Sequence, residues 1–380
     1  MQVKELRLVN FRNNRYSELG FTDGVNVIYG ENAAGKTNIL ESIFYFAAGK
    51  SFRNCKDREL IYFGEDGAAA ELCFGDSRKD VNLGVKIFKN RKREFLRNGN
   101  TVTKLSEYLG AFRAVIFTPD HLNLVKGQPE NRRRFIDLAI CQSYPRYVSY
   151  LSEYNRILLQ KNALLKQDTD KGYKADMIGI YNEKLSAAAA AISFNRRRFL
   201  KQLEECAASQ QEEISGGKEV LRLKYNGCFE EEPETAEETR VAMLAYLNSK
   251  REAEILRGIS LFGVHKDDFT IYLNNKNGRF FASQGQQRSA VLALKLAEGE
   301  MSRKVTGEYP VFLFDDILSE LDEGRRSIIL KKTGGRQVII TGCEKDYFSA
   351  LDVQNRIKVE KGMCFCETPS GGEKFALGQE

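Results

Sequence analysis

Residues 30–37 read Gly30-Glu31-Asn32-Ala33-Ala34-Gly35-Lys36-Thr37 and match the phosphate-loop pattern G-x-x-x-x-G-K-[ST]. The β-branched run of residues 24–29 before the loop predicts a short buried strand, and residues 38–44 after it have the apolar spacing of a helix. A glycine-rich loop between a strand and a helix turns backbone N–H groups toward a phosphate. The stretch therefore predicts an α/β fold with a nucleotide site at this loop.

The residue types of the loop assign separate tasks within that site. We expect residues 30–37 to surround the phosphates of ATP, with Lys36 reaching the β- and γ-phosphates and taking part in catalysis. The Thr37 hydroxyl is expected to bind Mg²⁺. ATP and Mg²⁺ are thus the predicted cofactors.

A second acidic element lies far along the chain. Residues 311–314 are apolar and end in Asp315 and Asp316, the form of a Walker B strand. Asp315 is expected to hold Mg²⁺, and Asp316 to polarise an attacking water as the catalytic acid residue. A plain strand cap is the alternative interpretation. The sequence Ser319-Glu320-Leu321-Asp322, typical of a D-loop in ABC-type ATPases, favours the Walker B strand.

An ABC-type signature precedes the acidic strand. Residues 283–288 contain the pattern S-x-G-Q with Ser283, Gly285 and Gln286, at the start of a helical stretch. In ABC-type ATPases this signature, like Asp322 of the D-loop, acts on the ATP of a second protomer, offering a helix N-terminus to the γ-phosphate. One loop and one signature per chain therefore predict an ATP-dependent homodimer.

Composition limits the class of protein. The 380 residues are 42% hydrophobic and 29% charged, which predicts a globular chain of two or three lobes. Apolar runs stay far below the roughly 20 residues of a membrane span. The first residues lack a signal-peptide core, so we expect a cytoplasmic protein without a membrane partner. A net charge of +6 permits an anionic partner without requiring one.

The distance between the motifs predicts a split domain. We expect an ATPase head formed by residues 1–125 and 256–380, with a β-rich lobe at about 50–118, and a mainly α-helical insert at 126–255. Strands are predicted at 67–74 and 81–88. Helices are predicted at 130–142, 145–165, 173–214 and 236–255, with Gly216 ending the longest of them and an acidic solvated loop at 230–234.

Four segments together resemble the RecF family of bacterial repair proteins, which have an ABC/SMC-type head. They are residues 8–13 with the phosphate loop, residues 118–137, residues 263–268 and residues 313–322. The resemblance implies a slow, DNA-stimulated ATPase that binds DNA at gaps or single-strand/double-strand junctions. It implies a role in recombinational repair, replication restart and the SOS response, loading the recombinase RecA with RecR as partner. It also implies that Arg12 and Asn13 contact the nucleotide.

The sequence departs from this pattern at the switch position. Thr341 stands at the position where a histidine is usual, after the neighbouring strand. The residue that senses the γ-phosphate is therefore not identified. The glutamine of the Q-loop is also not placed.

Basic residues are the candidates for DNA contact. The densest cluster surrounds a predicted hairpin with Asn98-Gly99 at its turn and includes Lys89, Arg91, Lys92 and Arg93. Arg132 and Arg133 begin a predicted helix, where positive charge opposes the helix dipole, so we expect an ionic partner, either DNA or an internal carboxylate. Residues 196–198 are interpreted as a solvated face, and His265 as a structural residue.

Two other functions remain as alternatives. One is an ATPase subunit of a membrane transporter, which the long insert and the RecF-type segments oppose. The other is a scaffold for recombination proteins that does not hydrolyse ATP, which the Asp315-Asp316 pair opposes.

Overall fold

The computed structural model describes residues 1–53, 55–75, 79–229, 233–317, 321–343, 348, 352–367 and 373–375. Contacts divide the chain into two compact units, Met1–His121 with Leu292–Glu380, and Leu122–Val291. The chain thus leaves the first unit once and returns to it. Within the described residues, no helix is both long enough and apolar enough to cross a membrane.

The first unit contains a seven-stranded sheet in the order β16-β15-β14-β3-β13-β12-β8. The five strands from β14 to β8 are parallel, and β15 and β16 are antiparallel additions at one edge. Every residue of β12 and β13 is buried, as expected where both faces of a parallel sheet are covered. The strands are β3 (Val25–Tyr29), β8 (Ala114–Phe117), β12 (Val311–Asp315), β13 (Val338–Gly342), β14 (Val353–Glu360), β15 (Met363–Glu367) and β16 (Glu373–Phe375).

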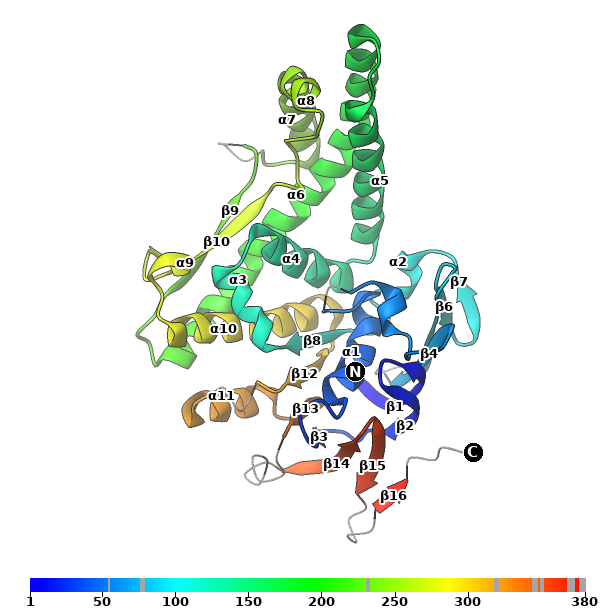
Figure 1. The fold of residues 1–380 in the computed structure, drawn as a ribbon. Coiled ribbons are helices and arrows are strands. Elements are labelled where there is room, and N and C mark those ends of the chain that lie inside the picture. Colours follow the sequence, from blue (N-terminus) through cyan, green and yellow to red (C-terminus); the bar gives the residue numbers. More distant parts are fainter. Residues whose placement is uncertain are drawn as a thin grey trace. The chain divides into compact units, whose positions relative to one another are not determined.

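Helix α1 (Lys36–Ala48) packs against β8, β12 and β13 (Figure 1). It follows the loop after β3, so the predicted strand–loop–helix order is confirmed. Helix α11 (Glu323–Thr333) lies between β12 and β13 in sequence. Helix α10 (Gln284–Thr306) begins in the second unit and ends in the first.

A six-stranded antiparallel sheet completes the first unit, in the order β2-β1-β4-β5-β6-β7. The predicted strands at 67–74 and 81–88 are confirmed as β4 and β5, and the predicted turn has Asn98 and Gly99 at φ 50° and 79°. Strand β8 belongs to the parallel sheet instead of the predicted β-rich lobe, because it pairs with β12. The elements are β1 (Gln2–Phe11), β2 (Asn14–Gly20), η1 (Asp57–Leu60), β4 (Gly67–Gly75), β5 (Asp80–Phe88), β6 (Glu94–Arg97), β7 (Asn100–Val102) and α2 (Leu105–Tyr108).

The second unit is built around α6, a helix of 45 residues that packs against α5 and α7. The Asp170 carboxylate caps its start, and Gly216 in the left-handed conformation ends it, as predicted. The helices are η2 (Pro119–Leu122, at the junction of the two units), α3 (Asn123–Lys126), α4 (Pro129–Ser143), α5 (Arg146–Lys166), α6 (Lys171–Ser215), α7 (Ala236–Ser249), α8 (Arg251–Arg257) and α9 (Gly278–Phe281).

This unit also contains a three-stranded sheet, β11-β10-β9, which the sequence did not predict. Strand β9 (Leu221–Asn226) pairs with β10 (Asp268–Leu273), and β10 with β11 (Lys276–Asn277). Because β10 lies beyond residue 255 and pairs with a strand inside the predicted insert, the second unit extends to Val291.

The prediction of a single helix at 236–255 is wrong, because α7 ends before Lys250 and α8 begins after it. After this break, α8 brings the fully buried Glu254 carboxylate to 2.6 Å from Lys161 Nζ on α5. Burial lowers the pKa of Lys161, although the nearby carboxylate opposes that shift. The acidic loop predicted at 230–234 falls in part on residues 230–232, outside the described residues.

The prediction that residues 196–198 form a solvated face is also wrong for Arg196. Arg196 is 3% exposed, and its Nε and Nη2 atoms donate to the Asp137 carboxylate at 2.8 Å. Its third nitrogen, Nη1, donates to the Val264 carbonyl at 2.7 Å. Arg196 therefore links α6 to α4 and to the chain before β10.

Candidate functional site

The phosphate loop adopts the conformation that its glycines permit. Gly30 and Gly35 have φ values of 153° and 117°, and a Cβ atom at Gly30 would lie 2.1 Å from the Val359 carbonyl oxygen. Among the described residues, no side chain caps the first turn of α1. The N-terminus of α1 is therefore a position where the helix dipole favours an anion.

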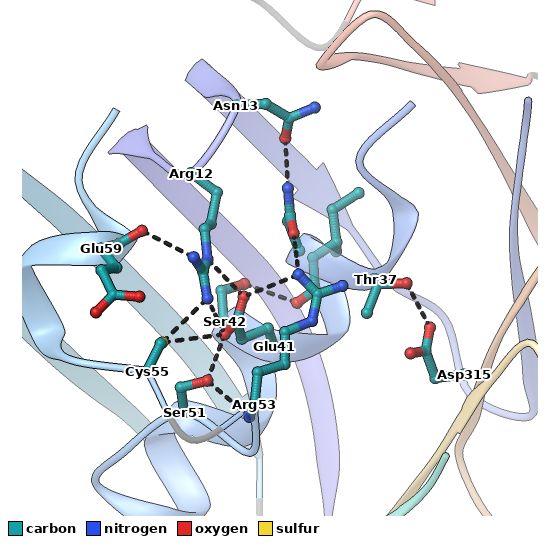
Figure 2. Close-up of polar contacts among 12 residues, drawn as sticks. Arg12, Asn13, Thr37, Glu41, Ser42, Ser51, Arg53, Cys55, Glu59 and Asp315 are labelled. Atoms are coloured by element: carbon teal, nitrogen blue, oxygen red, sulfur yellow. Dashed lines mark hydrogen bonds and ion pairs between the residues drawn. The ribbon is translucent and has the colours of Figure 1, made fainter. Parts of the chain in front are cut away.

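Lys36 and Thr37 take up the positions that the motif predicts. Lys36 is 7% exposed, and its ammonium donates to the carbonyl oxygens of Gly30 and Glu31 at 2.7 and 2.8 Å. The Thr37 hydroxyl donates to Asp315 Oδ1 at 2.8 Å (Figure 2). Segments almost 280 residues apart in the sequence thus meet at this point.

The acidic strand is held by a residue that the sequence reading left without a role. The Thr341 hydroxyl on β13 donates to Asp315 Oδ1 at 3.0 Å and accepts the N–H of Asp316 at 3.0 Å. Burial raises the pKa of Asp315, while the hydroxyls of Thr37 and Thr341 lower it. Thr341 therefore orients both acids from the next strand.

The Thr37–Asp315 pair fits a magnesium ion. A hydroxyl and a carboxylate 2.8 Å apart are the hard oxygen donors that Mg²⁺ prefers. A cation at this point would also stabilise the charged carboxylate, which burial disfavours.

Two turns hold the outer side of the phosphate loop. Asn13, in the turn between β1 and β2, donates from Nδ2 to the Ala34 carbonyl at 3.0 Å, and its Oδ1 accepts from Asn38 of α1 at 2.7 Å. Gly362, in the turn between β14 and β15, donates its N–H to the same Ala34 carbonyl at 3.0 Å. The loop is thus fixed from both ends of the chain.

Arg12 is bound to the protein through all three guanidinium nitrogens (Figure 2). Its Nε and Nη2 atoms donate to the fully buried Glu41 carboxylate of α1 at 2.8 and 2.7 Å, and Nη1 donates to the Glu59 carbonyl at 2.8 Å. The pair anchors the β1–β2 turn to α1. A nucleotide contact by Arg12 stays a prediction, and its observed partner is Glu41.

Two further residues near the loop carried no motif in the sequence. Arg53 Nη1 donates to Asn38 Oδ1 at 3.0 Å (Figure 2), and its charge partly opposes the rise that burial causes in the pKa of Asp315. Cys343, directly after β13, donates its thiol to Asn32 Oδ1 at 2.9 Å. Their only sequence signal is that Arg53 follows α1 and that Cys343 follows β13, the strand paired with β3.

The signature begins α10 in the second unit. The Ser283 hydroxyl accepts the N–H of Gln286 at 3.3 Å, and Gln286 Oε1 accepts the N–H of Ser283 at 2.9 Å. This reciprocal capping leaves Ser283 exposed and Gly285 half-buried at a helix N-terminus, where anions are favoured.

The D-loop is described only in part, because Ser319 and Glu320 lie outside the described residues. Asp322 caps α11, where its carboxylate accepts the N–H of Arg325 at 2.9 Å. That hydrogen bond lowers the pKa of Asp322. Its predicted action on a second protomer stays a prediction.

The basic cluster lies on the segment between β5 and β6, beside a hollow of about 460 Å³. Arg93 Nη1 lies 2.9 Å from the Asp57 carboxylate, while Arg91 lies over the Phe88 ring and 2.7 Å from the Glu94 carboxylate. Lys89 and Lys92 are exposed, and Lys89 Nζ lies 3.8 Å from an exposed carboxylate of Asp66. The two lysines therefore remain the better candidates for an anionic partner.

Arg132 was expected to pair with either DNA or an internal carboxylate, and in the structure it pairs with an internal carboxylate. Arg132 is 4% exposed and donates from Nε and Nη2 to the Asp268 carboxylate at 2.7 and 2.8 Å. Its predicted DNA contact is wrong, since no part of a DNA backbone reaches a buried guanidinium. Arg133 is half-buried and donates to the Asp267 carbonyl at 2.7 Å.

His265 has the structural role that the sequence predicts. Its Nδ1 atom lies 2.7 Å from the Tyr154 hydroxyl. Burial lowers the pKa of His265 to about 4, so the imidazole is neutral at pH 7.

A phosphate loop after β3, an acidic strand two positions along the parallel sheet and a capped signature helix together define an ABC-type ATP-binding head. A family model for the RecF/RecN/SMC N-terminal domain matches residues 2–365. A DNA replication and repair protein RecF from Exiguobacterium is 41% identical over 358 residues, which cover 93% of this chain and 95% of that protein. The chain belongs to the RecF family.

Solved structures agree with this assignment. The structure of the recombination mediator protein RecF with ATP in the RecFOR pathway matches with a TM-score of 0.90 and 33% identity, covering 97% of this chain and 98% of that one. An Smc head bound to the C-terminal winged-helix domain of ScpA has a TM-score of 0.55 at 16% identity, covering 96% of each chain. This second likeness shows the fold alone. The expected ABC/SMC-type head is confirmed.

Proposed function

We propose that this chain is an ATP-switched recombination mediator of DNA repair that acts in the cytoplasm. ATP closes two copies on DNA at gaps or single-strand/double-strand junctions, where they help to load RecA together with RecR. Slow hydrolysis, stimulated by DNA, then reopens the dimer. The observation that carries the proposal is the meeting of Thr37 with Asp315 beside Lys36, in a chain that resembles a RecF–ATP structure over 97% of its length.

The residues of the loop supply the binding chemistry. Lys36 turns from the carbonyls of Gly30 and Glu31 to the β- and γ-phosphates, and the N-terminus of α1 binds the same phosphates. Thr37 and Asp315 would hold Mg²⁺, which when bound neutralises charge that develops on the phosphate oxygens.

Hydrolysis requires an oriented water. Asp316 follows the metal-binding acid directly, and the Thr341 hydroxyl holds its backbone. We assign Asp316 as the group that accepts a proton from this water, a role that contributes about 10²–10⁴-fold to a rate. The paired acids favour this reading over a scaffold that does not hydrolyse ATP.

The second protomer completes each site. Ser283 and Gly285 present the N-terminus of α10 to the γ-phosphate held by the other copy, while Gln286 shapes that end by capping and Asp322 lies across the same contact. Lys89 and Lys92 contribute backbone-directed DNA contacts, which carry little sequence information.

Sedimentation with ATP and a gapped duplex tests this function. Wild type should dimerise with ATP, and the dimer should bind the duplex more tightly than the monomer does. Lys36→Ala should lose tight ATP binding, and Ser283→Arg should bind ATP and stay monomeric. Ser249→Arg is the matched control, because Ser249 is an exposed serine at the end of α7. An ATP-dependent dimer of Ser283→Arg would contradict the shared site.

A further inference from the structure

The chain bends at Asp316, the residue proposed to accept the proton, directly after β12 ends. Asp316 has a φ of 51°, in the left-handed region that is uncommon for residues other than glycine. Such a conformation persists where the surrounding structure holds it, and it is frequent at functional sites. The direction of a side chain follows from the backbone that carries it. Whatever holds this bend therefore also sets where the Asp316 carboxylate points.

Thr341 holds the bend from the neighbouring strand. In the parallel pair of β12 and β13, Thr341 lies opposite Asp315, the last residue of β12. The next N–H of the chain, that of Asp316, donates to the Thr341 hydroxyl at 3.0 Å. A side-chain oxygen thus accepts this N–H at the point where the pairing of the two strands ends.

The same hydroxyl also contacts the acid proposed to bind magnesium. It donates to Asp315 Oδ1 at 3.0 Å, and the Phe314 carbonyl is a more distant acceptor at 3.4 Å. Asp315 Oδ1 accepts the Thr37 hydroxyl as well, at 2.8 Å (Figure 2). Thr341 is only 1% exposed, and its single hydroxyl hydrogen is used within this group. Its position therefore suits an action on ATP through the two acids, without contact of its own.

We infer that Thr341 is a positioning residue for ATP hydrolysis. One hydroxyl joins the Thr37–Asp315 pair to the backbone of Asp316, so it places the acid that takes the proton relative to the acid that would hold the metal. The inference rests on the proposed function, in which Asp316 acts on the attacking water. Without the hydroxyl, the Asp316 N–H loses this acceptor and the bend relaxes. A displacement of about 1 Å at a reacting group can cost about 10²-fold in rate.

A purely structural role for Thr341 would have a different consequence. Loss of a buried hydroxyl would then lower the stability of the fold, and ATP binding and hydrolysis would fall together. A positioning role lowers the rate at saturating ATP and leaves the affinity for ATP unchanged. The affinity is kept because the contacts of Lys36 with the phosphate loop do not involve Thr341.

The test measures single-turnover ATP hydrolysis with Mg²⁺, and Kd for ATP, in variants of the full chain. Thr341→Val keeps the shape of the side chain but can neither donate nor accept a hydrogen bond. It should slow hydrolysis by about tenfold or more with an unchanged Kd for ATP. Thr341→Ser restores the hydroxyl and should recover most of the rate.

Thr333→Val is the matched control. Thr333 is a buried threonine of α11 whose hydroxyl donates to the Ile329 carbonyl at 2.8 Å. Its replacement removes a buried hydroxyl of the same kind, and the variant should hydrolyse ATP like wild type. Urea unfolding reports the stability of each variant. If valine at position 341 prevents folding, Thr341→Ala removes the same hydroxyl with less bulk and should show the same separation of rate from affinity.

A double-mutant cycle with Asp316→Asn tests whether Thr341 acts through Asp316. In the Asp316→Asn background, Thr341→Val should cause little further loss of rate, because the carboxylate that Thr341 positions is already gone. Equal losses in the two backgrounds would overturn the inference.

The other outcomes separate the possible failures. Wild-type turnover by Thr341→Val, with slow turnover by Asp316→Asn, would overturn this inference alone. A loss of ATP affinity in step with the rate, or no recovery with Thr341→Ser, would reduce Thr341 to a structural residue. Wild-type turnover by Asp316→Asn would overturn the proposed catalytic role of Asp316 as well.

Discussion

Replacing Gly362 with alanine should weaken ATP binding, although this residue lies 326 positions after Lys36 and is not itself a predicted nucleotide ligand. Gly362 has φ 82° in the turn between β14 and β15, and its N–H binds the Ala34 carbonyl of the phosphate loop at 3.0 Å. A Cβ atom there would lie 2.3 Å from the Asn13 carbonyl oxygen. Asn13 binds the same Ala34 carbonyl through its side chain, so the collision displaces both supports of the loop.

The size of the effect follows from two separate contributions. A left-handed alanine costs about 1–2 kcal/mol of stability wherever it stands. Relief of the 2.3 Å contact also requires the turn to move, which sacrifices the hydrogen bond to Ala34, worth about 1 kcal/mol. Because ATP must then order a looser loop, we expect a Kd for ATP raised by roughly fivefold, the equivalent of about 1 kcal/mol.

Gly335→Ala provides the matched control. Gly335 has φ 72°, and nothing lies within 4 Å of a Cβ atom placed on it, so this variant carries the backbone strain without the collision. Kd for ATP is measured by fluorescence titration, and urea unfolding of each variant reports its stability. If Gly362→Ala binds ATP as tightly as Gly335→Ala does, the turn does not support the loop.

Three other predictions concern hydrolysis, acid stability and DNA. Asp316→Asn should bind ATP normally, hydrolyse it about 10²–10⁴-fold more slowly and accumulate as the ATP dimer; wild-type turnover would place the catalytic carboxylate elsewhere. Because burial lowers the pKa of His265 to about 4, below its ordinary 6.5, the unfolded chain takes up a proton first, and stability should fall as pH drops from 6.5 to 4. His265→Gln should remove up to about 3 kcal/mol of this dependence in urea unfolding, and an unchanged slope would refute the assignment. Converting Lys89 and Lys92 to glutamine should lower DNA affinity and reduce the salt slope by roughly two units, with ATP binding intact; wild-type DNA binding would exclude this segment. Arg93 is left in place because its partner is Asp57.

Local chemistry was sufficient for the phosphate loop and the elements on either side of it. A strand, a glycine-rich turn and a helix start are each defined by a few adjacent residues, so residues 24–44 predict their own structure. The same holds for the turn at Asn98-Gly99 and the helix end at Gly216. The acidic strand was predicted because an apolar run with two terminal acids also lies within a few residues.

Charged side chains were the least predictable part, because their partners lie far away in the sequence. Arg132 and Arg196 occur in similar runs of three arginines, and neither run indicates whether its charge meets water, DNA or a carboxylate. The answer depends on Asp268 and Asp137, which lie 136 and 59 positions away.

The sequence by itself therefore determined the class of site and the residues that contact phosphate in such loops, since that chemistry is confined to short motifs. Only the tertiary structure decided what holds the motifs in place. Thr341 orients the acids from a neighbouring strand, Glu41 takes up Arg12, and Gly362 supports the loop from the far end of the chain. Each of these contacts joins elements whose distance in space is set by the pairing of strands and the packing of α1, and no local pattern of residues encodes that distance.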